Sequence, residues 1–385
     1  MVPSNTTASA PQTTAAAAAT KPSVDRAAAA PLPSSPRALP TIAKDPPSCL
    51  TTEALFTGVS LGKQLGQGHF SVVFSGSQIV NRATGAKPHP KLGEAVAVKR
   101  VDKARLTKKD AIALRAEVAI LSSIAHPRII GFSAWYEDDR FYWLVTELVQ
   151  GGELFDKIAS VTYYEESDAR RLVYVLASTL KFLHDCKCVH RDLKPENILL
   201  ANAEDDASIK LADFGFARVV PPELLSTSCG TPNYVAPEVI SGLRYGVSAD
   251  VWSLGVISYV LCAGYPPFSD ASQVELFRRI RRGQYQFDSP WWDPVSDTAK
   301  DFVARCLTVD MNKRPTIAQV LDHPWLASPR QEDGLNDLTQ TARELRVFNA
   351  RRRLRGFFRA AILSNQLAEV FAKARAKLLV KAHSA

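Results

Sequence analysis

The sequence predicts an α+β protein with a small β-rich N-terminal lobe and a larger helical C-terminal lobe. Two observations support this fold class. Between residues 58 and 93, short runs rich in Val and Phe alternate with glycine and polar residues, as they do in β-hairpins. Downstream of residue 152 the apolar spacing is mainly helical, apart from strand-like pieces at 198–200 and 209–211. The 385 residues, 46% of them hydrophobic, suffice for one large two-lobed domain.

The N-terminal residues 1–52 are rich in Ala, Ser, Thr and Pro and poor in bulky apolar side chains. This composition cannot offset the entropy lost when a chain becomes ordered, so we expect a disordered arm. A plastid or mitochondrial transit peptide has a similar composition and is the alternative interpretation.

Further elements follow from spacing and breakers. Residues 81–94 contain glycines and prolines and predict a long hairpin loop, 103–124 have helical spacing, and 141–147 read as a strand. The longest uncharged stretch, 251–269, contains two serines and the breaker pair Pro266-Pro267. It therefore predicts a buried core helix and not a membrane span.

Charge and cysteine content narrow the class of protein. The formal net charge is +8, but residues 343–385 carry +9 and the rest of the chain −1. This distribution predicts an acidic partner for a basic tail and no nucleic-acid-binding body. The six cysteines form no CxxC pair, which favours free thiols over a zinc site or disulfides, and the N-terminus lacks a signal-peptide pattern. We therefore expect a cytoplasmic protein, with the nucleus as a further location.

A glycine-containing turn between two expected strands is the first chemical signal. Glycine allows backbone amides to approach phosphate oxygens because no Cβ stands in the way. Ser71 replaces the third glycine of a GxGxxG pattern, and a strand follows in place of a helix, which counts against a dinucleotide-binding fingerprint. The stretch runs Leu65, Gly66, Gln67, Gly68, His69, Phe70, Ser71, Val72, Val73.

An ordered series of polar motifs follows this turn. It consists of Lys99 at the end of Val-Ala-Val-Lys, Glu117 on the next helix, His-Arg-Asp-Leu-Lys-Pro-Glu-Asn at 190–197, Asp-Phe-Gly at 213–215 and Ala-Pro-Glu at 236–238. In this order and spacing the chain resembles the eukaryotic protein kinases over residues 56–326. The resemblance implies a bilobal protein kinase fold with ATP and Mg²⁺ as cofactors and proteins as substrates.

Phosphoryl transfer requires accurately placed charge, and the resemblance gives each residue a role. Lys99, held by Glu117, neutralises the α- and β-phosphates, while Asp213 and Asn197 supply oxygen ligands to Mg²⁺. Asp192 takes or orients the proton of the substrate hydroxyl, and Lys194 meets the γ-phosphate. The expected contacts with ATP are Leu65, Gly66, Gln67, Gly68, His69, Phe70, Ser71, Val73, Ala97, Lys99, Glu147, Val149, Glu153, Asn197 and Asp213. A pseudokinase that only binds partners is the alternative, although none of the essential polar groups is replaced.

Substrate preference follows from a closer resemblance. Residues 144–156 are similar to the hinge of the calcium/calmodulin-dependent protein kinase group, which implies that the backbone at Glu147 and Val149 faces adenine. Glu153 and Glu196 match acidic positions that bind an arginine three residues before the target. The catalytic-loop sequence indicates Ser or Thr as the acceptor. The hypothesis is therefore a serine/threonine kinase acting on Arg-x-x-Ser sites.

Other matched positions concern activation and stability. Thr227 aligns with the activation-loop threonine that an upstream kinase phosphorylates in the calmodulin kinases, and Arg191 is the natural cation to receive that phosphate. Glu238 and Arg314 resemble the structural ion pair of the family, and Asp250 resembles its helix-capping acid.

The segment 327–370 is expected to be autoinhibitory and to bind calmodulin, and 371–385 form a basic tail. Residues 341–358 resemble the regulatory segment of the multifunctional calcium/calmodulin kinases. Leu354, Phe358 and Leu363 have 1-5-10 spacing and lie on one face of a basic helix, which suits the acidic groove of calcium-loaded calmodulin. The alternative is a calcium-independent kinase whose basic cluster binds a membrane surface or a nuclear importer.

Two departures limit the resemblance. Thr341 aligns with a regulatory autophosphorylation site, but Leu338 stands where an arginine is expected three residues earlier, so we do not expect autonomy through that site. No association domain follows the tail, and a monomer is expected.

Overall fold

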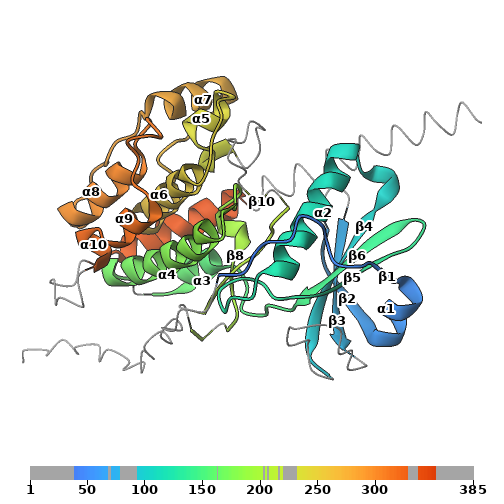
Figure 1. Ribbon diagram of the computed structural model, residues 1–385. Helices are drawn as coiled ribbons and strands as arrows, with labels where there is room; N and C mark the ends of the chain where they lie inside the picture. Colours follow the sequence, from blue (N-terminus) through green and yellow to red (C-terminus); the bar gives the residue numbers. More distant parts are fainter. Residues whose placement is uncertain are drawn as a thin grey trace, which may run out of the picture. The chain divides into compact units, whose positions relative to one another are not determined.

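The computed structural model describes residues 39–67, 71–78, 93–162, 164–202, 204–205, 208–215, 217–219, 232–327 and 337–352. Figure 1 shows a lobe built on a sheet and a lobe built from helices, as the sequence predicts. The expected hairpin loop at 81–94 lies outside the described residues, except for its last two.

The β-rich lobe contains one six-stranded sheet with the strand order β1-β5-β6-β4-β3-β2. Neighbouring strands are antiparallel except for β1 and β5, which are parallel. The strands are β1 (Leu50–Thr51), β2 (Val59–Gln67), β3 (Ser71–Gln78), β4 (Ala95–Asp102), β5 (Phe132–Glu137) and β6 (Phe141–Glu147). Valine-rich β4 lies between β6 and β3, and the side chains of Val96, Val98 and Val101 are buried against the faces of the sheet.

Two helices pack on this sheet. Helix α1 (Thr52–Gly58) contacts β1, β2 and β5, and α2 (Lys108–Ser123) contacts β5 (Figure 1). A 3₁₀ turn, Lys103–Arg105, precedes α2. Thr107 and Asp110 form a capping box that satisfies backbone amides at the start of α2. The helix expected at 103–124 is therefore present, but it begins later because this box sets its first turn.

The helical lobe is organised around α6 (Ser248–Ala263), which is buried at almost every position. Residues 251–263 of the uncharged stretch therefore form the predicted core helix, whereas 264–269 follow its end. The left-handed Gly264 ends it. The other helices are α3 (Leu154–Ser160), α4 (Glu166–Asp185), α5 (Pro237–Ile240), α7 (Gln273–Arg282), α8 (Asp297–Cys306), α9 (Ile317–Leu321) and α10 (Pro324–Ala327), and residues 339–352 are also helical.

Short strands hold the connecting loops of this lobe. Strand β7 (Cys188–Val189) pairs with β10 (Arg218–Val219), and β8 (Ile198–Leu200) pairs with β9 (Ile209–Leu211). The pieces at 198–200 and 209–211 are therefore strands, as the sequence predicts, and they form a hairpin that brings the segments on either side of it together.

Residues 39–52 have more structure than composition predicts. The sequence places the end of a disordered arm at residue 52, whereas Leu50–Thr51 form β1 and the Pro47 carbonyl accepts a hydrogen bond from Trp135 Nε1 at 3.1 Å. Partners supplied by the sheet, which composition does not reveal, order residues 39–52. The arm before residue 39 lies outside the described residues.

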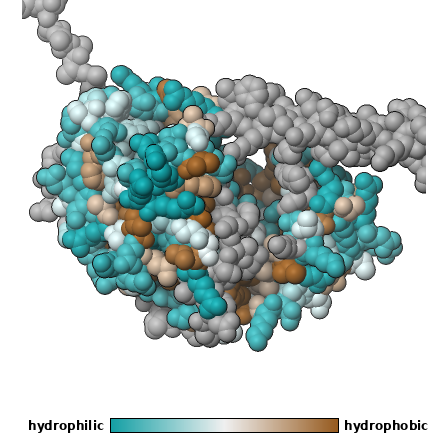
Figure 2. All heavy atoms as spheres, turned by 90° about the horizontal axis from the view of Figure 1, so that it is seen from above, coloured by the Kyte–Doolittle hydropathy of each residue, from teal (hydrophilic) through white to brown (hydrophobic). Residues whose placement is uncertain are grey.

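The face of the molecule seen in Figure 2 is mainly polar. Hydrophilic residues predominate on it among the described residues, and hydrophobic ones lie in small groups. Among the helices in the described ranges, none has the length and apolar content needed to cross a bilayer.

A buried ion pair joins distant parts of the helical lobe. Arg314 Nη1 lies 2.7 Å from Glu238 Oε1, and Nη2 lies 2.9 Å from Oε2, with both side chains nearly inaccessible. The guanidinium also donates to the carbonyl oxygen of Ser248 at the start of α6 and stacks over the ring of Trp252. The expected structural pair is therefore present and fixes α5 to α6.

We expect Arg314→Met to lower the free energy of unfolding by about 3–5 kcal/mol, because it leaves the Glu238 carboxylate buried without a cation. Chemical denaturation monitored by tryptophan fluorescence measures this change. Lys313→Ala, at an exposed position next door, is the control and should shift stability by no more than about 0.5 kcal/mol. Equal effects of the two substitutions would contradict the role of the pair.

Candidate active site

The loop between β7 and β8 is fixed from below by Asp250 of α6. Its carboxylate, fully buried, accepts hydrogen bonds from the amides of His190 at 2.9 Å and Arg191 at 2.8 Å, and from His184 Nε2 at 2.9 Å. Burial acts to raise the pKa of Asp250, but these hydrogen bonds outweigh it and hold the pKa below its ordinary value. Asp250 is therefore an ionised anchor of the loop.

Asp192, at the centre of this loop, is almost fully buried. Lys194 Nζ lies 2.5 Å from Asp192 Oδ2, and Asn197 Nδ2 donates to the Asp192 carbonyl at 2.8 Å and to Oδ2 at 3.3 Å. The three predicted residues therefore form one hydrogen-bonded group. A carboxylate held by a cation and an amide is oriented to accept a proton from a bound hydroxyl.

Lys99 on β4 and Glu117 on α2 form the predicted ion pair. Lys99 Nζ lies 3.2 Å and 3.4 Å from the two carboxylate oxygens of Glu117. Burial acts to lower the pKa of Lys99, but the carboxylates of Glu117 and Asp213 outweigh it and raise the pKa. Lys99 is consequently charged and linked electrostatically to both carboxylates.

Asp213 follows β9 in a left-handed backbone conformation, with φ of 58°, and its Oδ1 accepts a hydrogen bond from the amide of Gly215 at 3.3 Å. Burial acts to raise its pKa, but Lys99 and Lys194 outweigh it and hold the pKa below its ordinary value. An ionised carboxylate and the amide oxygen of Asn197 are the hard oxygen ligands that Mg²⁺ prefers. Asp213 and Asn197 therefore fit the predicted metal role.

The strands beside the glycine turn are in place. Leu65, Gly66 and Gln67 end β2, and Gly66 and Gln67 pair with Val73 and Val72 of β3. The turn residues Gly68, His69 and Phe70 lie outside the described residues, whereas Ser71 starts β3.

The predicted adenine region lies where β6 ends. Ala97 of β4 pairs with Thr146, next to Glu147. The amide of Glu147 donates to the Gly131 carbonyl at 2.9 Å, so this N–H is already engaged. The predicted contacts of adenine with the backbone at Glu147 and Val149 would therefore not use the amide of Glu147.

Glu153 and Glu196, far apart in sequence, approach the same cation. The guanidinium of Arg352 contacts Glu153 Oε2, and its Nε lies 4.0 Å from Glu196 Oε1. Asp156, which the sequence did not single out, adds a third carboxylate 3.7 Å from Arg352 Nη2. Its position three residues after Glu153, on the first turn of α3, is the signal that could have identified it. Glu153, Asp156 and Glu196 together are termed the acidic subsite.

Several predicted regulatory residues lie outside the described ranges. They are the activation-loop residue Thr227 and the calmodulin-binding residues Leu354, Phe358 and Leu363.

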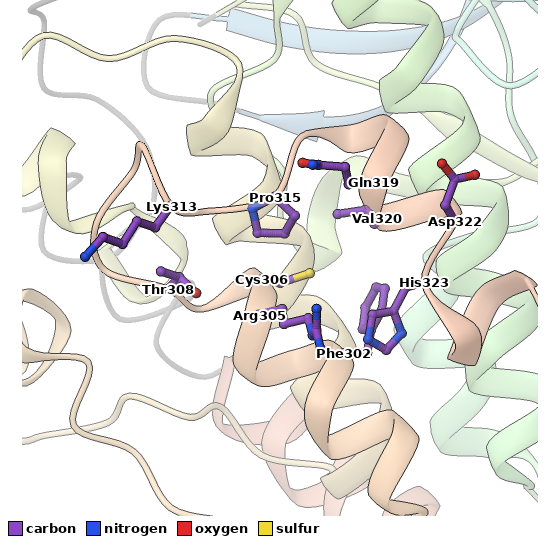
Figure 3. A pocket seen from close by; sticks show the side chains of 10 residues that line it. All are labelled: Phe302, Arg305, Cys306, Thr308, Lys313, Pro315, Gln319, Val320, Asp322 and His323. Carbon is purple, nitrogen blue, oxygen red and sulfur yellow. The ribbon is translucent and has the colours of Figure 1, made fainter.

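Two cavities of similar size differ in their position relative to the predicted site residues. One, of about 380 Å³, lies between α8 and α9, and none of the predicted site residues lines it (Figure 3). Both ring nitrogens of His323 at its edge are already hydrogen bonded, to Asp301 and to the amide of Trp325. The other, of about 360 Å³, is lined by Glu196, Tyr234 and, from the C-terminal segment, Glu344, Val347, Phe348, Arg351 and Arg352. It therefore adjoins the acidic subsite.

Comparison with known proteins agrees with this geometry. Residues 59–326 match the family model described as the protein kinase domain. The chain belongs to the protein kinase family. It is 40% identical over 304 residues to calcium/calmodulin-dependent protein kinase type 1 of Caenorhabditis briggsae, covering 79% of this chain and 82% of the relative. It is also 42% identical over 276 residues to the human type 1B kinase, covering 72% and 77%. The mouse type IV kinase is 43% identical over 256 residues, covering 66% and 54%.

The kinase is a serine/threonine kinase of this group, and its residues suit the reaction. We expect Asp192 to accept the proton of the substrate hydroxyl as the hydroxyl oxygen bonds to the γ-phosphorus of ATP and ADP leaves. We expect Lys99 to bind α- and β-phosphate oxygens, and Lys194, which lies beside Asp192, to neutralise charge on the transferred group. When bound at Asp213 and Asn197, Mg²⁺ supplies neutralisation of phosphate charge.

We expect Asp192→Asn to lower kcat by about 10²–10⁴-fold, because the amide cannot accept the proton, while MgATP still binds. Single-turnover phosphorylation of a peptide separates the chemical step from nucleotide binding. Asp185→Asn, a surface carboxylate paired with Lys181, is the matched control and should leave kcat unchanged. Wild-type kcat in Asp192→Asn would remove this residue from the reaction.

Proposed function

We propose that this kinase phosphorylates Arg-x-x-Ser-like sites, that residues 337–352 inhibit it by docking on the helical lobe, and that calcium-loaded calmodulin releases them. The proposal rests mainly on one observation: Arg352 of the C-terminal segment occupies the acidic subsite.

The C-terminal segment is attached along its length. The amide of Leu338 donates to the Tyr164 carbonyl at 2.8 Å, and the hydroxyl of Thr341 donates to the Cys262 carbonyl at 2.8 Å. The guanidinium of Arg346 donates to the backbone carbonyls of Ala159, in the last turn of α3, and Val161, directly after it. Carbonyls at the end of a helix favour a cation, so this contact is electrostatically favourable.

Close packing accompanies these bonds. Leu338, Ala342 and Leu345 are buried in the main core. A Cβ added at Gly264 would come within 2.5 Å of the Glu344 Cβ, so glycine at the end of α6 leaves room for the segment. Asn349 Nδ2 donates to the Phe155 carbonyl at 2.8 Å and fixes the turn of helix before Arg352. Arg352 is thereby directed to the acidic subsite.

The acidic subsite suits a substrate arginine. Burial raises the pKa of Glu153, while Arg352 opposes this shift. A partly desolvated carboxylate is stabilised most by a guanidinium that offers paired N–H donors. Arg352 therefore imitates the substrate residue, and the segment competes with protein substrates for this site.

Calmodulin accounts for release. The relatives bear the name calcium/calmodulin-dependent, and the basic residues with 1-5-10 anchors continue the segment beyond Arg352. Calmodulin that binds this region as a helix would disfavour the docked arrangement, since the segment cannot bind calmodulin and the helical lobe at the same time. Phosphorylation of Thr227 by an upstream kinase and a cytoplasmic location belong to the same proposal.

The docked state also bears on Thr341. This side chain is 2% exposed and its hydroxyl is hydrogen bonded to Cys262, so no kinase can reach it while the segment is docked. Its modification would have to follow release.

We expect the full chain to phosphorylate an Arg-x-x-Ser peptide slowly without calmodulin and faster with calcium-loaded calmodulin. A truncation ending at Ala342, which lacks Arg352, should be active without calmodulin. A matched peptide with Ala in place of the Arg tests the subsite and should raise KM more than it changes kcat. Equal turnover of the two peptides would refute the substrate proposal, and calmodulin-independent activity of the full chain would refute the switch.

We further expect Arg352→Ala to raise calmodulin-independent activity about tenfold, because a charge-assisted hydrogen bond contributes about 1.5–3 kcal/mol to docking. Peptide phosphorylation without calcium provides the measurement. Arg351→Ala is the matched control, since Arg351 is exposed and adjacent, and its basal activity should stay low. If both variants were activated equally, general loss of positive charge would explain the effect and the specific pairing would not.

A further inference from the structure

Residues 42–55 lie before the matched kinase domain, which begins at residue 59, yet they complete its sheet. We term them the N-terminal strap. Leu50 and Thr51 pair in parallel with Tyr136 and Glu137 at the edge of the sheet. Leu55 is fully buried in a small core formed with Val96, Val98, Tyr136, Trp143 and Val145. The strap is therefore packed as part of the β-rich lobe.

The strap also reaches the far end of α2. The amide of Ala43 donates to Ser123 Oγ at 2.9 Å, and Ser123 Oγ donates in turn to the Ala119 carbonyl at 2.7 Å. Ile42 packs against the main core, to which α2 contributes Val118 and Leu121. The start of the strap, at Ala43, is thus hydrogen bonded to α2, whereas Leu50 and Thr51 near its end form a strand beside β5.

Trp135 of β5 connects these two attachments. It is 2% exposed, and its Nε1 donates to the Pro47 carbonyl in the middle of the strap at 3.1 Å. Its ring stacks on Tyr142 of β6 with centroids 5.4 Å apart, and the guanidinium of Arg115 on α2 lies 5.8 Å from its centre. Trp135 therefore contacts the strap, the sheet and α2 together.

Helix α2 carries Glu117, and Lys99 lies on β4 of the sheet. Their 3.2 Å contact spans the same interface that the strap bridges, so a shift of α2 by 1–2 Å, of the size packed helices undergo, would separate them. We infer that the N-terminal strap positions Glu117 against Lys99, so that a segment outside the kinase domain sets the rate of phosphoryl transfer. This inference requires the kinase activity but not the regulation proposed for the C-terminal segment.

The strap can be weakened with little change of shape. Trp135→Phe keeps an aromatic ring on Tyr142 but loses the bond to Pro47, and Ser123→Ala removes the acceptor for Ala43. We expect the combined variant, in the full chain with calcium-loaded calmodulin present, to lower kcat about threefold to tenfold, since the strap loses its hydrogen bonds to both Trp135 and Ser123. Ser123→Thr, which retains a hydroxyl, should restore most of the loss due to Ser123→Ala.

A double-mutant cycle with Glu117→Gln separates positioning from general stability. If the strap acts through Glu117, weakening it in the Glu117→Gln background should lower kcat no further. Lys44→Ala, within the strap but exposed and without a hydrogen bond or ion pair in the described part of the chain, is the control and should retain full activity. Unchanged kcat on weakening the strap, or the same fold loss in both backgrounds, would overturn the inference. Thermal unfolding of each variant identifies any that fail to fold, and for those the milder single variants replace the combined one.

Discussion

The geometry of the active site depends on one buried carboxylate, that of Asp250. It binds the amides of two consecutive loop residues, His190 and Arg191, and thereby fixes the backbone that presents Asp192. Asp250 lies on α6, which is buried at almost every position, so the loop is attached to a rigid part of the core. His184 completes the arrangement by giving the second carboxylate oxygen another donor. A reactive group on a loop is precise here because the loop is held at its base.

The two lobes contribute opposite charges to the site. The β-rich lobe supplies the cation of Lys99, which is raised in pKa and fully charged, and the helical lobe supplies the anion of Asp213, which is lowered in pKa. Each would be destabilised by burial alone, so each stabilises the charged state of the other. Phosphate and metal binding therefore depend on keeping the lobes together, because the charge of Lys99 is stabilised by carboxylates outside its own strand.

Local patterns predicted much of this structure. The strands at 141–147, 198–200 and 209–211 have the predicted bounds, and Lys99, Glu117, Asp192, Asn197 and Asp213 assemble as the motif order implies. The N-terminal strap could not be predicted, since two-residue β1 is too short for any periodicity and its partner lies 86 residues away. The role of Asp156 and the position of Arg352 also depend on contacts between distant segments, since Arg352 and Glu153 are 199 residues apart. Periodicity reports which face of an element is buried, but not which segment covers it.

The contact between Arg352 and the acidic subsite is made within one chain. A group tethered to the surface it binds experiences an effective concentration on the order of millimolar, which a free peptide would rarely reach. Each contact along the segment can therefore be weak and the segment still remain docked. A competitor that binds the tail must outweigh this docking equilibrium, which combines a modest intrinsic affinity with the effective concentration, and its own binding energy has to supply the difference.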